Sequence, residues 1–123
     1  MRYQCGSHKA DILLNCAGIQ RRSEAAEFTD EDIDAVLDIN LKATLVSCQE
    51  FAKKNLADGR PGKVINIASI ISFIGGKNIT PYAASKGGVM QLSKAFSNEW
   101  AEKGIQVNSI RISPFDPRLD LVC

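Results

Sequence analysis

Three short apolar runs, separated by two long amphipathic segments, constrain the fold of this chain more than any other feature. The runs are DILLN (11–15), KVINIAS (63–69) and IQVNSIRI (105–112). Short continuous apolar runs bounded by turn residues are typical of strands buried in a parallel sheet. The segments between them, 28–56 and 80–103, carry apolar residues at helical spacing. The alternation predicts an α/β fold, a βαβαβ unit with a parallel sheet and right-handed crossovers.

The ends of the two predicted helices carry capping signals. Thr29 or Asp30 is placed to cap the first helix. ISFIGGKNIT, which precedes the second helix, contains a glycine pair and is predicted to be a loop. Its last residue, Thr80, is expected to cap the second helix, with Pro81 as the first helical residue. Gly104 lies where a left-handed residue is expected to end that helix.

Composition and charge narrow the classes of function. The 123 residues suit one domain, and the net charge of +1 gives no basic face for nucleic acid. The sequence contains neither an apolar run long enough for a membrane nor a signal-peptide core, so a cytoplasmic location is expected. The four cysteines form no CxxC pair, and His8 is the sole histidine. A disulfide framework and a metal site are therefore not expected.

A tyrosine and a lysine stand four residues apart where the second helix is predicted to begin. Tyr82 and Lys86 in TPYAASKGG would share one helix face. An ammonium group near a phenol favours the phenolate, so the pair has the chemistry of a general acid or base. The positive end of the helix dipole would act in the same direction. Taken alone, the spacing favours a half-buried aromatic residue beside a solvated lysine, because such a pair arises by chance in many chains.

Ser69 ends the second predicted strand and is a candidate to hold a substrate oxygen. Ligands of open parallel sheets bind at the carboxyl ends of the strands, which is where Ser69 lies. Ser72, three residues further on, is the alternative. Ser72 is expected to form local hydrogen bonds in the loop.

Five short motifs along the chain occur in an order known from one enzyme family. They are NCAG (15–18), INL (39–41), INIAS (65–69), YAASK (82–86) and VNSI (107–110). In this order the chain resembles the short-chain dehydrogenase/reductase family over about residues 10–110. The resemblance implies a partial Rossmann-type, doubly wound parallel sheet of about three strands and two long helices.

The resemblance also implies a catalytic role for four residues. Tyr82 would exchange the hydroxyl proton, and Ser69, thirteen residues earlier, would position the carbonyl group. Lys86 would support the tyrosine and hold the nicotinamide ribose, and Asn40 would hold a water molecule of the proton relay. Asn40 has a structural alternative, because a polar residue in an apolar helix stripe can simply face solvent.

The implied reaction is hydride transfer between NAD or NADP and a secondary alcohol or ketone. Residues expected to line the cofactor site, besides Tyr82 and Lys86, are Asn15, Ala17 and Gly18. Cys16 replaces an asparagine of the family motif, and its thiol cannot reproduce the hydrogen bonds of an amide.

Two longer segments are similar to one group within the family. AGIQRRSEAAEFTDED (17–32) and NEWAEKGIQVNSI (98–110) resemble the 2-deoxy-D-gluconate 3-dehydrogenase type, which acts on sugar acids. Arg21 and Arg22 lie in the loop that borders the cleft in this fold, and a guanidinium group can bind a carboxylate with two hydrogen bonds. The alternative is two solvated loop arginines.

Segments expected from the family are missing at both ends. No Gly-rich cofactor turn precedes residue 11, and residues 111–123 diverge from the family pattern. Residues 1–123 are therefore interpreted as a single, incomplete NAD(P)-binding domain with much apolar surface exposed. Self-association through the two long helices is expected. The alternative to an enzyme is an inactive isoform that associates with a full-length relative through its helices.

Overall fold

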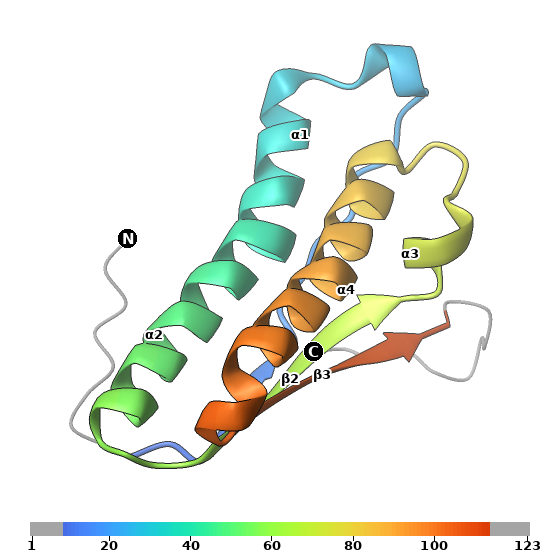
Figure 1. Cartoon of the computed structure of the whole chain (residues 1–123). Coiled ribbons are helices and arrows are strands. Elements are labelled where there is room, and N and C mark those ends of the chain that lie inside the picture. The colour runs from blue at the N-terminus through green and yellow to red at the C-terminus, as the bar shows by residue number, and fades with distance from the viewer. Residues whose placement is uncertain (1–8, 114–123) are drawn as a thin grey trace.

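Three parallel strands form the centre of the fold. The computed structural model describes residues 9–113 (Figure 1). The strands β1 (Ile12–Asn15), β2 (Gly62–Ser69) and β3 (Ile105–Ile112) lie side by side in the order β1-β2-β3. All three point in the same direction, because the paired residues advance together, from Ile12 with Lys63 to Asn15 with Asn66. The predicted parallel sheet is confirmed.

The first long helix is interrupted at its centre. It consists of α1 (Asp30–Leu37), a π-helical segment η2 (Asp38–Lys42) and α2 (Ala43–Ala57). A short 3-10 turn, η1 (Ala25–Glu27), precedes it. The predicted cap is confirmed, because the Thr29 hydroxyl accepts the N–H of Asp32 at 3.2 Å. The prediction of one regular helix was wrong at η2, where helical turns are wider and the Thr44 hydroxyl donates to the Asn40 carbonyl.

The second long helix, α4 (Thr80–Trp100), continues into a 3-10 turn, η3 (Ala101–Lys103). Gly104 ends it in the left-handed conformation, with φ of 84°, as predicted. The predicted cap at Thr80 was wrong. The residue at the cap position is Ile79, which makes no side-chain capping bond. Burial of the Ile79 side chain explains the shift, because packing fixes the start of the helix in place of a capping hydroxyl.

The segment predicted to be a loop contains one helical turn, α3 (Ile71–Ile74). The Ser69 hydroxyl accepts the N–H of Ile71 at 3.2 Å, and this bond satisfies a free backbone donor at the start of the turn. Ile71 is buried. The prediction failed because a helix this short leaves no periodic pattern in the sequence.

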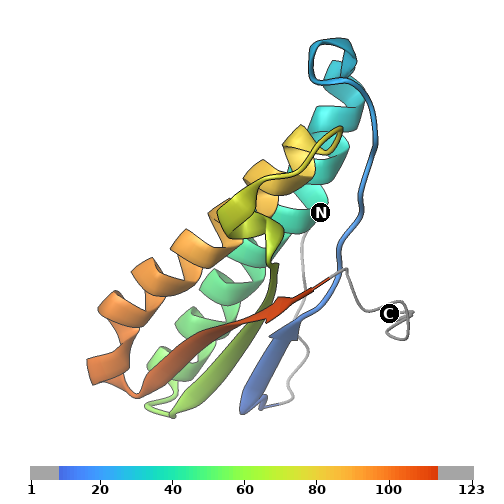
Figure 2. The ribbon, with the colours of Figure 1, turned by 90° about the vertical axis from the view of Figure 1, so that its right-hand side faces the viewer.

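Both long helices cover the same face of the sheet (Figure 2). The core lies between them and the sheet, and it contains Cys48, Phe51, Ala52, Val64, Trp100, Ile105 and Val107. Phe96 stacks on Trp100 with ring centroids 4.1 Å apart. Burial of these apolar side chains provides the main stabilising free energy of the layer.

The other face of the sheet is open. Its exposed side chains include Ile12 (61% exposed) and Leu14 (56%) of β1 and Ile110 (50%) of β3. The prediction that β1 is a buried strand was therefore wrong, although the predicted exposure of apolar surface is confirmed for this face. On the long helical segments the exposed large apolar side chains are fewer and less exposed, with Ile39 at 39% and Leu56 at 36%.

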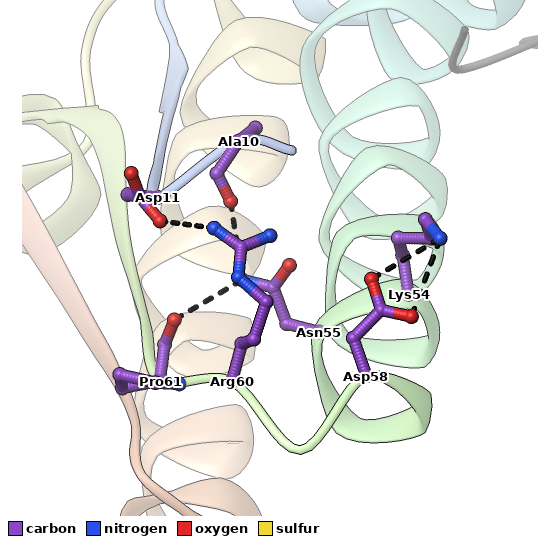
Figure 3. Close-up of polar contacts among 7 residues, drawn as sticks. All are labelled: Ala10, Asp11, Lys54, Asn55, Asp58, Arg60 and Pro61. Atoms are coloured by element: carbon purple, nitrogen blue, oxygen red, sulfur yellow. Dashed lines mark hydrogen bonds and ion pairs between the residues drawn. The ribbon is translucent and has the colours of Figure 1, made fainter. Parts of the chain in front are cut away.

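A buried amide joins α2 to the start of the sheet (Figure 3). The Asn55 side chain donates to the carbonyl groups of Ala10 and Pro61, at 3.3 and 3.4 Å. Arg60 forms an ion pair with Asp11 beside it. These contacts connect the residues that immediately precede β1 and β2.

Within residues 9–113, no helix is long and apolar enough to cross a membrane, and no cluster of metal-ligating side chains occurs. Cys5, His8 and Cys123 lie outside the described residues.

Candidate active site

Asn40 is buried at the π-helical segment, with 1% of its surface exposed. Its side-chain oxygen accepts the N–H of Ile19 at 2.8 Å, and its amide donates to the Ile19 carbonyl at 2.9 Å. The same amide also donates to the Ser85 hydroxyl at 3.0 Å. The solvent-facing alternative is therefore wrong. Asn40 fixes the loop after β1 against both long helices.

Lys86 is also buried, with 6% of its surface exposed. Its ammonium group donates to the Ile67 carbonyl at 2.7 Å and lies 5.9 Å from the ring centroid of Tyr82. Burial lowers the pKa of Lys86, and Coulombic attraction from Cys16 partly opposes this effect. The solvated alternative for Lys86 is thus wrong. A positive charge is held close to a half-buried phenol ring.

Ser69 and Ser72 are hydrogen-bonded to each other. Ser69 is buried, and its backbone N–H is donated to the Ser72 hydroxyl at 3.3 Å. Ser72 in turn donates to the Lys86 carbonyl at 2.8 Å. The local bond expected of Ser72 is confirmed, and the bond to α4 was not predicted.

The side chain of Asn15 is used inside the protein. Its oxygen accepts from the Ser47 hydroxyl at 2.7 Å, and its amide donates to Asn66 at 2.8 Å. The same amide also donates to the Cys48 sulfur at 3.3 Å. Burial raises the pKa of the Cys48 thiol to about 11. Because its side chain is engaged, Asn15 would meet a ligand mainly through its backbone.

Gly18 lies against both buried polar residues. A Cβ atom at Gly18 would be 3.4 Å from Asn40 Oδ1 and 3.6 Å from Lys86 Nζ. A side chain here would cover the lysine, so glycine keeps the ammonium approachable from this loop. Ala17 and Cys16 line a neighbouring depression of about 270 Å³, together with Leu14, Asn15, Ile39, Ala43, Thr44 and Ser47.

Arg21 and Arg22 are exposed in the loop between β1 and α1. The Arg21 guanidinium forms a 3.3 Å ion pair with Asp32 of α1. The backbone N–H of Ser23 donates to the Asn78 carbonyl, which holds this loop against the segment before α4. The arginines therefore lie near the N-terminal end of α4.

The four residues predicted to be catalytic belong to one set of contacts. Asn40 bonds to Ser85, whose hydroxyl donates to the Tyr82 carbonyl at 2.8 Å. Sequence reasoning missed Ser85. The available signal was its position three residues after Tyr82, which places both on one side of the helix.

Comparisons with known proteins agree with this geometry. A family model for short chain dehydrogenases matches residues 4–120. The 2-dehydro-3-deoxy-D-gluconate 5-dehydrogenase of Escherichia coli (strain K12) is 47% identical over 100 residues, which are 81% of this chain and 40% of that enzyme. The chain thus spans about two fifths of this relative's length.

Solved structures show the same arrangement of strands and helices. One from Agrobacterium tumefaciens with bound NADP, provisionally named a 2-deoxy-D-gluconate 3-dehydrogenase, is 54% identical with a TM-score of 0.81 and covers 82% of this chain and 41% of its own. A gluconate 5-dehydrogenase from Burkholderia cenocepacia J2315, in complex with NADP and tartrate, is 38% identical with a TM-score of 0.84. That match covers 90% of this chain and 43% of the other.

These matches confirm the resemblance drawn from the five motifs, and the three strands with their helices are part of a Rossmann-type sheet. The chain belongs to the short-chain dehydrogenase family.

Proposed function

We propose that this chain carries the acid–base half of an NAD(P)-dependent oxidoreductase that interconverts a secondary alcohol and a ketone. The observation that supports this most directly is the buried Lys86 ammonium beside the Tyr82 ring. Burying a lysine is unfavourable unless its charge is compensated. The Ile67 carbonyl supplies part of that compensation, and a phenolate at Tyr82 would supply more.

The proton passes through the oxygen of Tyr82. In the oxidation direction, the Tyr82 phenolate takes the proton of the substrate hydroxyl while the carbon loses a hydride. In the reduction direction, the Tyr82 hydroxyl gives that proton to the carbonyl oxygen. The Lys86 ammonium group, 5.9 Å from the centroid of the Tyr82 ring, would stabilise the phenolate in both directions, because opposite charges attract more strongly in a partly buried site than in water.

Ser69 and Asn40 support this exchange. The Ser69 hydroxyl accepts from the backbone of Ile71, so its own hydrogen is available to a substrate oxygen. Asn40 uses its side chain for the Ile19 backbone. We propose that Asn40 holds in place the helical segment beside which a water molecule of the proton relay connects to Lys86.

The residues after β1 fit a nicotinamide cofactor. Gly18 leaves room that a Cβ would fill, 3.6 Å from the Lys86 ammonium group. Asn15, Ala17 and Gly18 would contact the cofactor mainly through their backbones, and Tyr82 and Lys86 through their polar groups. When bound, NAD or NADP accepts or supplies the hydride. The NADP in two of the similar structures supports this class of cofactor.

A sugar acid is the proposed substrate. The names of the relatives, which include gluconate-type dehydrogenases, support this class. Arg21 and Arg22 are the residues proposed to bind its carboxylate. Arg21 already pairs with Asp32, so the substrate would share or displace an exposed ion pair that contributes little stability.

The test is oxidation of a hexonate such as gluconate by the chain, with NAD and NADP each supplied. Tyr82→Phe removes the proton-carrying oxygen and should lower kcat by about 10²- to 10⁴-fold. Lys94→Met, an exposed substitution on the same helix, is the matched control and should leave the rate unchanged. Activity that survives Tyr82→Phe would contradict the assigned role.

Cofactor binding is tested separately from turnover. Trp100 is the only tryptophan and lies at the end of α4, so its fluorescence follows unfolding of that helix in urea. A ligand that binds only the folded chain raises the free energy of unfolding. We expect millimolar NAD or NADP to move the midpoint upward. An unmoved midpoint would refute cofactor binding by this chain.

A further inference from the structure

Ser85 connects two site residues that lie on different elements. Its hydroxyl is fully buried, accepts from the Asn40 amide at 3.0 Å and donates to the Tyr82 carbonyl at 2.8 Å. Asn40 lies on η2 and Tyr82 in the first turn of α4. One hydroxyl therefore sets the position of the π-helical segment relative to the helix that carries the tyrosine.

Ser72 makes the same kind of connection between β2 and α4. Its hydroxyl accepts the backbone N–H of Ser69 at 3.3 Å and donates to the Lys86 carbonyl at 2.8 Å. Ser69 lies at the end of β2, and Lys86 lies one turn after Tyr82 in α4. The strand end and the lysine are thus joined through one side chain.

We propose that Ser72 and Ser85 are positioning residues that hold Ser69 and Asn40 in register with Tyr82 and Lys86. This inference rests on the proposed function, because it takes those four residues to act together. Each hydroxyl uses one lone pair and its only hydrogen, so neither connection can be kept by a side chain that only donates or only accepts.

A third buried serine provides a matched control. Ser93 also lies on α4, accepts from an asparagine amide (Asn66, 2.9 Å) and donates to a helix carbonyl (Val89, 2.8 Å). Its partner Asn66 belongs to the network around Asn15, and the side-chain hydrogen bonds of Ser72 and Ser85 include neither Asn66 nor Val89. Ser93→Ala therefore removes an equivalent pair of hydrogen bonds without touching either connection.

The first experiment follows amide hydrogen exchange by NMR in the chain itself and needs no activity. The N–H of Ile19 is donated to Asn40, so its exchange reports how firmly Asn40 is held. Ser85→Ala should raise that exchange rate roughly tenfold, the effect of losing one neutral hydrogen bond. Ser72→Ala should do the same for the N–H of Ser69.

Two conservative variants separate positioning from stability. Ser72 is half-buried, and Ser72→Thr, which restores a hydroxyl, should restore slow exchange at Ser69. Ser85→Cys preserves most of the volume but bonds weakly, so fast exchange at Ile19 should persist. Ser85→Cys is the variant to use if Ser85→Ala does not fold.

Unchanged exchange at Ile19 and Ser69 would overturn the proposal, as would an equal increase in Ser93→Ala. Where turnover is measurable, both alanine variants should lower kcat about tenfold and leave the KM for the cofactor unchanged. Equal losses in Ser93→Ala would also overturn the proposal. If the exchange effects are confirmed but the chain transfers no hydride, the proposed function is refuted and the positioning role of the two serines is not.

Discussion

At the scale of single residues, Lys86 is the clearest case of a group whose surroundings alter its chemistry. Its ammonium is buried against the Ile67 carbonyl and the Tyr82 ring, and burial lowers its pKa. In the unfolded chain that desolvation is absent. The unfolded state therefore binds more protons at any pH between the lowered value and the ordinary lysine pKa.

It follows that Lys86 makes the free energy of unfolding rise with pH across that window. Lys86→Met, which has similar volume and no charge, should lack this rise. The free energy of unfolding of the wild type minus that of the variant, measured by urea unfolding at several pH values, should therefore increase with pH. The raised pKa of Cys48 has the opposite effect, but it is present in both proteins and cancels. A constant difference would contradict the lowered pKa.

Cys48 provides a second prediction at this scale. Burial raises its pKa to about 11 from an ordinary value of 9.0, so at pH 8 its thiolate fraction should fall about a hundredfold. We expect iodoacetamide to label Cys48 far more slowly in the folded chain than in urea. Cys16 is partly exposed and should be labelled before Cys48. Mass spectrometry of the two peptides provides the measurement, and equal labelling rates would disprove the burial of Cys48.

The sequence indicated candidate site residues but few of their contacts. Tyr82 and Lys86 could be proposed because their four-residue spacing occurs together with the four other motifs. The burial of Asn40 could not, since a polar residue in an apolar stripe fits either a solvated or a hydrogen-bonded position. Its partner, the Ile19 backbone, lies 21 residues away, and local patterns carry no information on such contacts.

At the scale of elements, the ends of the strands and of the second long helix were predictable where a glycine, or a change in the spacing of apolar residues, marks them. Gly104 shows this, because its left-handed φ is a local requirement. The π-helical segment and α3 were not predictable. The first depends on Thr44 and Ser85 bonding to Asn40, and the second on the burial of Ile71.

Two glycines should respond in opposite ways to alanine. A Cβ at Gly62, the first residue of β2, would lie 2.6 Å from Asn55 Nδ2 and 2.7 Å from the Phe51 ring. Both neighbours are buried, so Gly62→Ala should destabilise the chain by about 1–3 kcal/mol. At Gly87 the nearest atom, the Ser72 carbonyl oxygen, would be 3.8 Å away.

Gly87→Ala should therefore stabilise α4 by about 0.5–1 kcal/mol, the gain in helix propensity. Urea unfolding monitored by Trp100 fluorescence measures both variants on one scale. Two changes of the same sign would contradict the packing described around Gly62.

At the scale of the whole molecule, the sheet is covered by helices on one face only (Figure 2). The large apolar side chains with high exposure include Ile12 and Ile110 on the open face and Phe73 and Ile74 on α3. The outer surface of α2 carries charged residues instead, such as the pair Lys53 and Glu50. Self-association through the long helices stays a prediction. The open face of the sheet is an alternative surface for association, because it exposes large apolar side chains.

Light scattering can distinguish these two surfaces. We expect the average mass to rise with protein concentration, because association buries apolar area. If the open face drives association, Ile12→Lys combined with Ile110→Lys should reduce that rise. Ile39→Lys on the first helix is the comparison. A reduction by Ile39→Lys alone would favour the helices, and a concentration-independent monomer would contradict both.

The π-helical segment also determines which changes in chain length the molecule can accept. A π turn holds one residue more than an α turn, and a single residue advances an α-helix by about 100°. Deleting one residue within Asp38–Lys42 would convert the wide turn into an α turn and leave α1 and α2 in nearly the same rotation about the helix axis. Deleting one residue from α1 or α2 would instead rotate Thr29, Arg21 and the rest of the preceding loop by about 100° relative to the residues that follow the deletion. In the π-helical segment, the number of residues is therefore constrained less tightly than in the regular helices on either side.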